Sequence, residues 1–86
     1  MMREALQHAM GQVIQQRRRA LGLTQSQLAR RIGTGRPLVA RVENGRHELG
    51  MGTLYRYAKG LQCRPSDLVL AAEALTAPDL VEEAAE

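Results

Sequence analysis

Residues 24–45 of this chain read TQSQLARRIGTGRPLVARVENG and predict two short helices joined by a tight turn. Thr24 and Gln27 have the spacing of a capping box, in which each side chain binds the backbone N–H of the other residue. Gly33 then closes the first helix, and Gly45 follows the second. Two short helices around a glycine turn form the motif that lays its second helix into the DNA major groove. This stretch therefore suggests a contact with DNA as well as a fold.

The segment before this pair predicts a longer helix. Apolar side chains recur at near 3.6-residue spacing over residues 3–21, which is the periodicity of an amphipathic helix. Gly22 follows, at a point where a helix commonly ends on a left-handed residue.

Two further helices are predicted after the pair. Residues 46–52 contain two glycines and predict a loop, after which Thr53 caps a fourth helix with an apolar stripe. Pro65 suits the first position of a fifth helix, because a missing N–H loses no hydrogen bond there. We expect the fifth helix to end near Leu75, since residues 76–78 (Thr-Ala-Pro) break the chain.

The composition favours helices over sheets. The 86 residues include no Trp or Phe and only two Tyr, and β-branched residues never alternate with polar ones over a useful length. A chain of this length forms one domain at most. We therefore predict an all-α fold, a compact five-helix bundle over residues 1–75. An acidic tail at residues 76–86 is expected to be either a short helix or disordered.

Charge is unevenly distributed along the chain. Residues 1–72 carry all twelve Lys and Arg and only four Asp and Glu, a net charge of +8, whereas residues 73–86 carry five acidic residues and no base. Eleven of the twelve cations are Arg, whose guanidinium suits phosphate groups and guanine edges. A basic body of this kind favours a polyanionic partner such as double-stranded DNA.

Other function classes find little support in the sequence. His8 and His47 are far apart and lack a Cys or carboxylate cluster at metal-ligand spacing, so we expect no metal site, no cofactor and no catalytic residue. The single Cys63 cannot form an intramolecular disulfide. Neither a signal peptide nor an apolar run long enough to cross a membrane is present, which predicts a cytoplasmic protein without a membrane partner.

The second helix of the quoted stretch has two faces. The apolar residues that we expect to face the core are Leu38, Val39 and Val42. Arg36, Pro37 and Arg41 then lie on the outward face. Arginine can donate two hydrogen bonds to O6 and N7 of guanine, whereas proline offers only an apolar contact. We therefore predict Arg36 and Arg41, together with Pro37, as the base-reading residues.

Polar residues flank this face and predict contacts to DNA phosphates. Gln25 lies in the first turn of its helix, where the side chain, the backbone N–H groups and the helix dipole can meet one phosphate. Thr34, Asn44 and Arg46 lie just before and after the second helix and are placed to hold the DNA backbone on either side. Arg17, at the cationic end of the first predicted helix, is a further phosphate-binding candidate.

A longer pattern resembles the Cro/C1-type helix-turn-helix domain (Xre family) of phage repressors. It consists of Gly11-x-x-Ile14-x-x-x-Arg18-x-x-x-Gly22-Leu23-Thr24-Gln25-x-x-Leu28-Ala29-x-x-Ile32-Gly33, then Val39-x-x-Val42-Glu43-Asn44-Gly45, with Leu54-x-x-Tyr57-Ala58-x-x-Leu61 and Asp67-Leu68 downstream. The match covers roughly residues 10–70. The resemblance implies a lambda-repressor-like bundle of five helices, in which the third helix enters the major groove and a two-fold dimer reads a pseudo-palindromic operator.

The resemblance also implies roles for single residues. The family's base-contacting positions fall on Arg36, Pro37 and Arg41. Its phosphate-binding Gln falls on Gln25, and its phosphate-facing position after the third helix falls on Asn44.

An ion pair between the first and third helices is implied for Arg18 and Glu43, and this pair would give Glu43 a structural role. Three positions depart from the family pattern. Gly35 replaces the usual Ser or Thr that caps the third helix, and Pro37 replaces a polar residue. Gln62 replaces the usual Gly after the fourth helix.

The leading hypothesis is a sequence-specific, dimeric, DNA-binding transcriptional repressor. The apolar surface that we expect to form the dimer lies on the fifth helix and includes Leu68, Val69, Leu75 and Leu80. An alternative with the same chemistry is an antitoxin that represses its own operon and binds a partner toxin through the acidic tail. A third hypothesis, a protein-interaction adaptor that keeps the fold without reading DNA, is disfavoured by Arg36 and Arg41.

Overall fold

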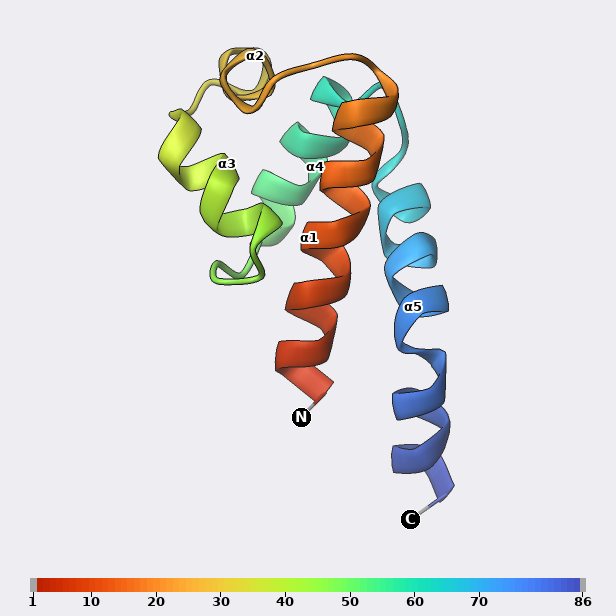
Figure 1. Ribbon diagram of the computed structural model, residues 1–86. Coiled ribbons are helices and arrows are strands. Elements are labelled where there is room, and N and C mark those ends of the chain that lie inside the picture. The colour runs from red at the N-terminus through yellow and green to blue at the C-terminus, as the bar shows by residue number, and fades with distance from the viewer. Residues whose placement is uncertain (1, 86) are drawn as a thin grey trace.

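The chain folds into five helices, shown in Figure 1. This computed structural model describes the backbone of residues 2–85 and the side chains of residues 2–76. The helices are α1 (Met2–Ala20), α2 (Gln25–Ile32), α3 (Arg36–Glu43), α4 (Met51–Gly60) and α5 (Pro65–Ala85). Residues 2–85 contain no β-strand, so the predicted all-α bundle of five helices is confirmed.

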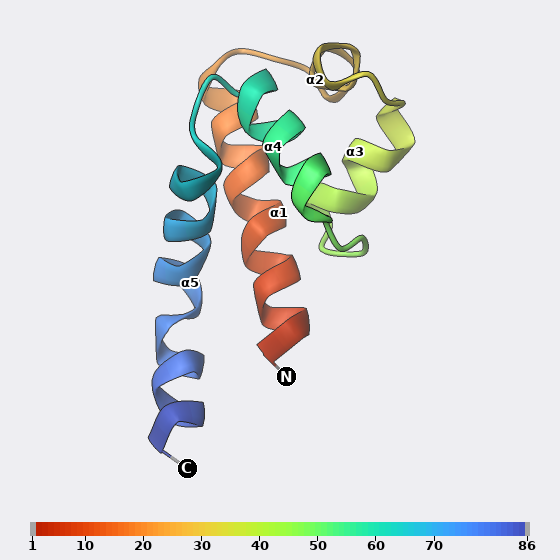
Figure 2. The same ribbon diagram turned by 180° about the vertical axis from the view of Figure 1, so that it is seen from behind.

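The two long helices form one side of the molecule. α1 and α5 lie side by side and run in opposite directions, as both views of the ribbon show (Figure 1 and Figure 2). The three shorter helices gather around the C-terminal half of α1 on its other side. The α2–α3 pair is therefore held at one end of the bundle, away from most of α5.

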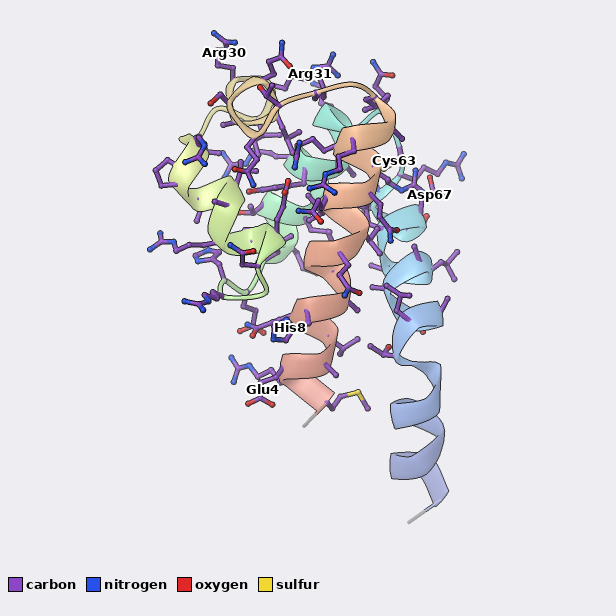
Figure 3. The ribbon with its side chains drawn as sticks, viewed as in Figure 1. Glu4, His8, Arg30, Arg31, Cys63 and Asp67 are labelled. Atoms are coloured by element: carbon purple, nitrogen blue, oxygen red, sulfur yellow. The ribbon has the colours of Figure 1, made fainter. Side chains whose placement is uncertain are left out.

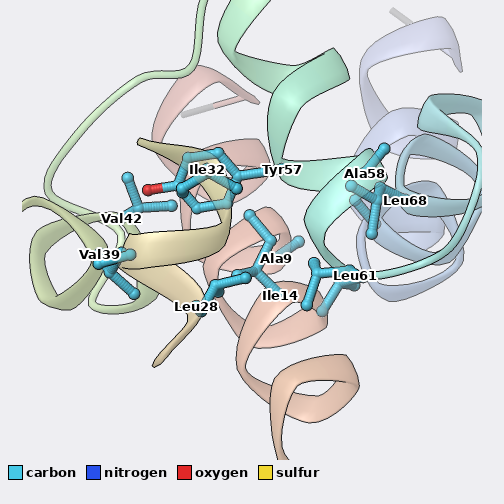
Figure 4. Packing of buried hydrophobic residues seen from close by; sticks show 13 residues of the cluster. Ala9, Ile14, Leu28, Ile32, Val39, Val42, Tyr57, Ala58, Leu61 and Leu68 are labelled. Carbon is cyan, nitrogen blue, oxygen red and sulfur yellow. The ribbon is translucent and has the colours of Figure 1, made fainter. Parts of the chain in front are cut away.

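All five helices contribute to a single core, drawn in Figure 4. Its buried apolar residues are Ala9, Val13, Ile14, Leu28, Ala29, Ile32, Val39, Val42, Tyr57, Ala58, Leu61, Leu68 and Ala72. Val39 and Val42 belong to this set, so the inward face predicted for α3 is confirmed at these two positions, while Leu38 is half-buried. Burial of this apolar surface is the main force that holds α3 against the rest of the domain.

Local sequence signals set both ends of α2. The Thr24 hydroxyl accepts a hydrogen bond from Gln27 N–H at 3.0 Å, and Thr24 N–H donates to Gln27 Oε1 at 2.8 Å, so the predicted capping box is present. Gly33 follows α2 with a φ of 73°, and Thr34 N–H donates to the Ala29 carbonyl at 2.9 Å. The left-handed φ suits glycine because glycine has no Cβ to clash.

α1 and α3 cross at Gly11. A Cβ built on Gly11 would lie 2.5 Å from the carbonyl oxygen of Val42 and 2.6 Å from that of Glu43. These separations are far shorter than an ordinary van der Waals contact. Because either carbonyl belongs to the backbone of α3, any larger residue at this position would push the two helices apart.

α4 begins earlier than the sequence predicts. Its first residue is Met51 and its N-cap is Gly50, which makes no side-chain capping hydrogen bond. The prediction that Thr53 caps this helix is therefore wrong, because Thr53 already lies within its first turn. The Thr53 hydroxyl instead accepts a long hydrogen bond of 3.5 Å from Arg56. The helix starts at this point because the Gly50 carbonyl already accepts a hydrogen bond from Leu54 N–H at 2.9 Å.

α5 extends beyond its predicted end at Leu75 and continues to Ala85. Thr76 does not end the helix. Its buried hydroxyl donates to the carbonyls of Ala72 and Glu73, at 3.1 and 3.3 Å. These bonds within the helix replace the hydrogen bonds that the hydroxyl would otherwise make to water. Pro78 lacks the N–H that would be donated one turn back, which removes one helical hydrogen bond without ending the helix.

The end of α4 contains a non-glycine residue in a glycine-like conformation. Gln62, where the family pattern has glycine, has a φ of 58°. A side chain in this left-handed region clashes with its own backbone, at a free-energy cost of about 1 kcal/mol.

Candidate nucleic-acid interface

The outward face of α3 carries the residues predicted to read DNA bases. Arg36, Pro37 and Arg41 are all exposed, whereas Val39 and Val42 on the opposite side are fully buried. α3 has only eight residues, so this face presents little more than two turns of helix. The structure therefore leaves both guanidinium groups and the proline ring of α3 accessible.

The start of α3 is open. Gly35 is its N-cap and makes no side-chain hydrogen bond, so no hydroxyl or carboxylate covers the first N–H groups of the helix. Pro37 lies in the first turn, where its missing N–H loses no helical hydrogen bond. Its ring can make only apolar contacts, so hydrogen bonds from this face must come from the two arginines.

A buried ion pair fixes the other end of α3. Arg18 Nε lies 2.6 Å from Glu43 Oε2, and Arg18 Nη2 donates to Glu43 Oε1 at 2.9 Å. Both residues are buried, and the remaining Arg18 nitrogen donates to the carbonyl of Leu23 at 2.8 Å. The guanidinium thus grips the last residue of α3 with two parallel hydrogen bonds, the geometry that makes Arg–carboxylate pairs strong and directional.

Two amide side chains complete the contacts of Glu43. Gln25 Nε2 donates to Glu43 Oε1 at 3.1 Å, and Gln15 Nε2 donates to the same oxygen at 3.4 Å. Burial alone raises the pKa of the Glu43 carboxyl, but hydrogen bonds from Arg18, Gln25 and Gln15 and the charge of Arg18 outweigh it, so the pKa is lowered overall. We call Gln15, Arg18, Gln25 and Glu43 the Glu43 network; it joins α1, α2 and α3.

Gln15 was not predicted as part of this network. It lies three residues before Arg18 on α1, and residues at that spacing share one face of a helix. The spacing was the available signal, but it does not indicate which side chain of another helix would meet the pair.

Four of the five predicted phosphate-binding residues flank α3. Gln25 and Thr34 are half-buried and lie at the two ends of α2, while Asn44 and Arg46 are exposed and follow α3 directly. One N–H of the Gln25 amide is donated to Glu43, which leaves its second N–H for another acceptor.

Arg17 lies apart from these residues. It is half-buried on α1, and its charge acts on the Cys63 thiol. Burial raises the pKa of that thiol, and the charge of Arg17 opposes the rise only in part. Arg17 is therefore close enough to the α4–α5 connection for its charge to act on Cys63.

Other cations lie outside the predicted site. Figure 3 shows Arg30 and Arg31 extending outward from α2. Arg31 Nη1 donates to the carbonyl of Gly60 at 3.1 Å, which ties the end of α2 to the end of α4. Arg31, Arg56 and Lys59 line one open hollow there, a grouping that the sequence analysis did not identify.

The described residues hold neither a cluster of metal ligands nor a helix that could cross a membrane. No group of three or more His, Cys, Asp or Glu side chains in this part of the chain is arranged to hold a metal ion. None of the helices there is both long and apolar enough to span a membrane.

Comparison with known proteins gives concordant matches. A family model described as helix-turn-helix matches residues 14–68. A protein of Rhodospirillum rubrum, described as an uncharacterized transcriptional regulator in the ATPase CF(0) region, is 45% identical over 51 residues, which make up 59% of this chain and 47% of that protein. The match thus spans about half the length of this curated relative.

Solved structures share the fold. The restriction-modification controller protein C.AhdI from Aeromonas hydrophila is 31% identical, with a TM-score of 0.73 over 76% of this chain and 94% of its own. The clp gene regulator ClgR from Corynebacterium glutamicum is 23% identical, with a TM-score of 0.81 over 91% of this chain and 83% of its own.

Proposed function

Since the chain belongs to the Cro/C1-type helix-turn-helix family, we propose that it is a DNA-binding transcriptional regulator that places α3 in the major groove and represses its target genes. One observation carries the proposal: Arg36, Pro37 and Arg41 are exposed on α3, whereas its two valines are buried in the core. Arg36 and Arg41 donate to guanine edges, and the Pro37 ring contacts an apolar group such as a thymine methyl.

Phosphate contacts on both sides of α3 set its position in the groove. Gln25 reaches one DNA strand from the start of α2, and Thr34, Asn44 and Arg46 reach the backbone from the two ends of α3. Arg17, which is half-buried near the end of α1, is proposed as a further phosphate contact. The described relatives support regulation as the general role, because two of them are described as regulators and one as a controller protein.

The Glu43 network keeps the reading face in one orientation. Glu43 is the last residue of α3, and its partners come from α1 and α2. Gln25 is shared between this network and the proposed phosphate contact, so the amide that meets the DNA backbone is held by the same carboxylate that holds α3. Such pre-positioning reduces the entropy lost when the protein binds.

We propose a two-fold dimer that reads two half-sites. Val69, Leu70 and Leu75 are exposed apolar residues of α5 and supply the contact. Leu68, which was expected on this surface, is fully buried in the core and does not contribute, so that prediction is wrong. Leu80 lies outside the residues whose side chains are described. A dimer of this type reads half-sites about one helical turn, roughly 34 Å, apart.

Selection from random DNA, combined with a native mass measurement of the complex, tests this function. We expect an enriched, pseudo-palindromic sequence bound by two chains. Affinity for it should fall by orders of magnitude between about 50 and 200 mM salt if six or more phosphates are contacted. Failure to enrich any sequence, or a salt-independent affinity, would contradict the proposal.

Two alternative functions depend on different parts of the molecule. The antitoxin hypothesis depends on the acidic tail, whose side chains lie outside the described residues, and it stays a prediction. The adaptor hypothesis requires an α3 face without DNA-binding chemistry, and the exposure of Arg36 and Arg41 speaks against it. A regulator of this kind acts where the DNA is, which agrees with the predicted cytoplasmic location.

A further inference from the structure

A small cavity lies between α1 and the loop that joins α3 to α4. Its volume is about 190 Å³. Figure 1 and Figure 2 both show this loop beside the N-terminal half of α1. None of the residues that line the cavity belongs to the predicted base-reading or phosphate-binding set.

The inner wall of the cavity is apolar. Leu6, Met10, Val42, Leu49 and Leu54 supply this wall from α1, α3, the loop and α4. Drug-sized ligands usually occupy pockets of about 300–1,000 Å³, so this cavity suits a smaller molecule. An apolar protein cavity of about 150 Å³ is large enough for benzene. The occupant is therefore the size of one aromatic ring with a short substituent.

Among the residues that line the cavity, Arg3 is the one Arg or Lys and Glu48 the one Asp or Glu. Arg3 donates one hydrogen bond to Glu48 at 2.6 Å, and both side chains are exposed. The other guanidinium N–H groups of Arg3, together with the amide of Gln7 and the imidazole of His47, are the remaining donors at the rim.

We propose that this cavity binds small apolar carboxylates, with the apolar body against Leu6, Met10 and Leu54 and the carboxylate at Arg3. The ligand carboxylate accepts hydrogen bonds from Arg3 and competes with Glu48 for them. Such a site is an addition to the proposed DNA-binding role, and its existence does not depend on that role.

The position of the cavity couples the ligand to the α3–α4 loop. Val42 forms part of its wall and belongs to α3, and Arg46 lies on the same loop as Leu49. The loop packs tightly on α1, because a Cβ built on Gly45 would lie 2.6 Å from Nδ1 of His8. A ligand that shifts this loop moves Arg46, and this step rests on the proposed DNA-binding function.

Titration of the full 86-residue chain with benzoate, followed by NMR amide shifts, tests the site. We expect saturable shifts around the cavity. Arg3→Gln should weaken benzoate binding on the order of tenfold, because a charged hydrogen bond is lost. Glu48→Gln should strengthen binding several-fold, because the competing carboxylate is removed. Arg19→Gln, an exposed change elsewhere on α1, is the matched control and should leave binding unchanged.

Ligands of the same shape but different charge separate the alternatives. Benzyl alcohol that binds as tightly as benzoate would overturn the carboxylate assignment. If benzylamine binds more tightly than benzoate and loses affinity in Glu48→Gln, the site binds cations through Glu48, and the carboxylate assignment is wrong. Shifts that do not saturate, or that persist unchanged in the cavity-filling variant Leu6→Phe, would show that benzoate does not occupy this cavity.

The coupling has its own measurement. Saturating benzoate should change the affinity for selected DNA by about fivefold or more in the wild type and less in Arg3→Gln. Unchanged DNA affinity with bound benzoate would overturn the coupling and leave the site in place. A chain that selects no DNA but still binds benzoate would contradict the proposed function alone.

Discussion

Two Arg–Glu pairs in this molecule have the same N–O distance but differ in their burial and in their additional hydrogen-bond partners. Arg18–Glu43 and Arg3–Glu48 both measure 2.6 Å, but the side chains of the first are 9% and 1% exposed and those of the second 75% and 54%. Glu43 also accepts from two glutamines, and Arg18 also bonds a backbone carbonyl. The distance alone therefore says little about the energy of an ion pair, because burial and additional partners determine it.

Removing one partner of the buried pair should have the largest effect. Glu43→Ala leaves the Arg18 guanidinium buried without its carboxylate, and we expect the free energy of unfolding to fall by about 3–5 kcal/mol. Urea denaturation measures this change. Glu48→Ala is the matched control on the exposed pair and should leave the urea midpoint unchanged within error. Equal losses of stability in Glu43→Ala and Glu48→Ala would contradict the conclusion that burial and additional partners set the energy of these ion pairs.

The exposed arginines of α3 should affect DNA binding and not stability. Arg36→Ala and Arg41→Ala should each weaken binding to the selected site by about 1–3 kcal/mol and relax the base preference locally. Binding titrations against single-base variants of that site measure this effect. An unchanged preference would contradict the base-reading assignment, and a large loss of stability would mean that these side chains hold the fold.

Acid should weaken the buried pair. The folded-state pKa of Glu43 is lowered below its ordinary value of 4.5, so the network contributes stability above that pH and loses it as the pH falls toward the lowered pKa. Unfolding experiments from pH 7 to pH 3 should show this loss in the wild type and a smaller one in Glu43→Gln, which has no carboxyl to protonate. The same acid sensitivity in both proteins would assign it to other carboxyls.

The two glutamines of the network should differ in a smaller way. Both donate to Glu43 Oε1, but only Gln25 is proposed to contact phosphate. Gln25→Ala should weaken specific and non-specific DNA binding about equally, by roughly 1 kcal/mol, whereas Gln15→Ala should change stability slightly and DNA binding not at all. If both variants change DNA affinity equally, Gln25 acts only by holding Glu43 and does not contact phosphate.

Features encoded within a few residues were predictable from the sequence. The capping box at Thr24 and the left-handed Gly33 depend only on their immediate neighbours, and both occur as predicted. The inward valines of α3 follow from helical periodicity. The helix positions that do not face the core are left exposed, so Arg36 and Arg41 could be identified from the sequence alone.

Features set by distant contacts were not predictable in the same way. Arg3 and Glu48 are 45 residues apart, and Gln15 meets Glu43 across 28, so no local pattern indicates either contact. α4 starts after Gly50, which has no capping side chain, so no local signal marks its beginning. Leu68 was placed on the surface because an apolar helix stripe does not reveal which neighbour covers it.

Gly11 has a consequence for how this molecule adapts to different partners. With only a hydrogen atom between the backbones of α1 and α3, the two helices meet as rigid surfaces, and no side chain at the crossing can change rotamer to let α3 rock. If α3 enters the major groove as proposed, a DNA with a variant groove width must bend to fit it or be reached by the long arginine side chains of α3. The missing methyl group at Gly11 thus fixes α3 against α1, and in the proposed complex adaptation to imperfect sites is left to the DNA and to the arginine side chains.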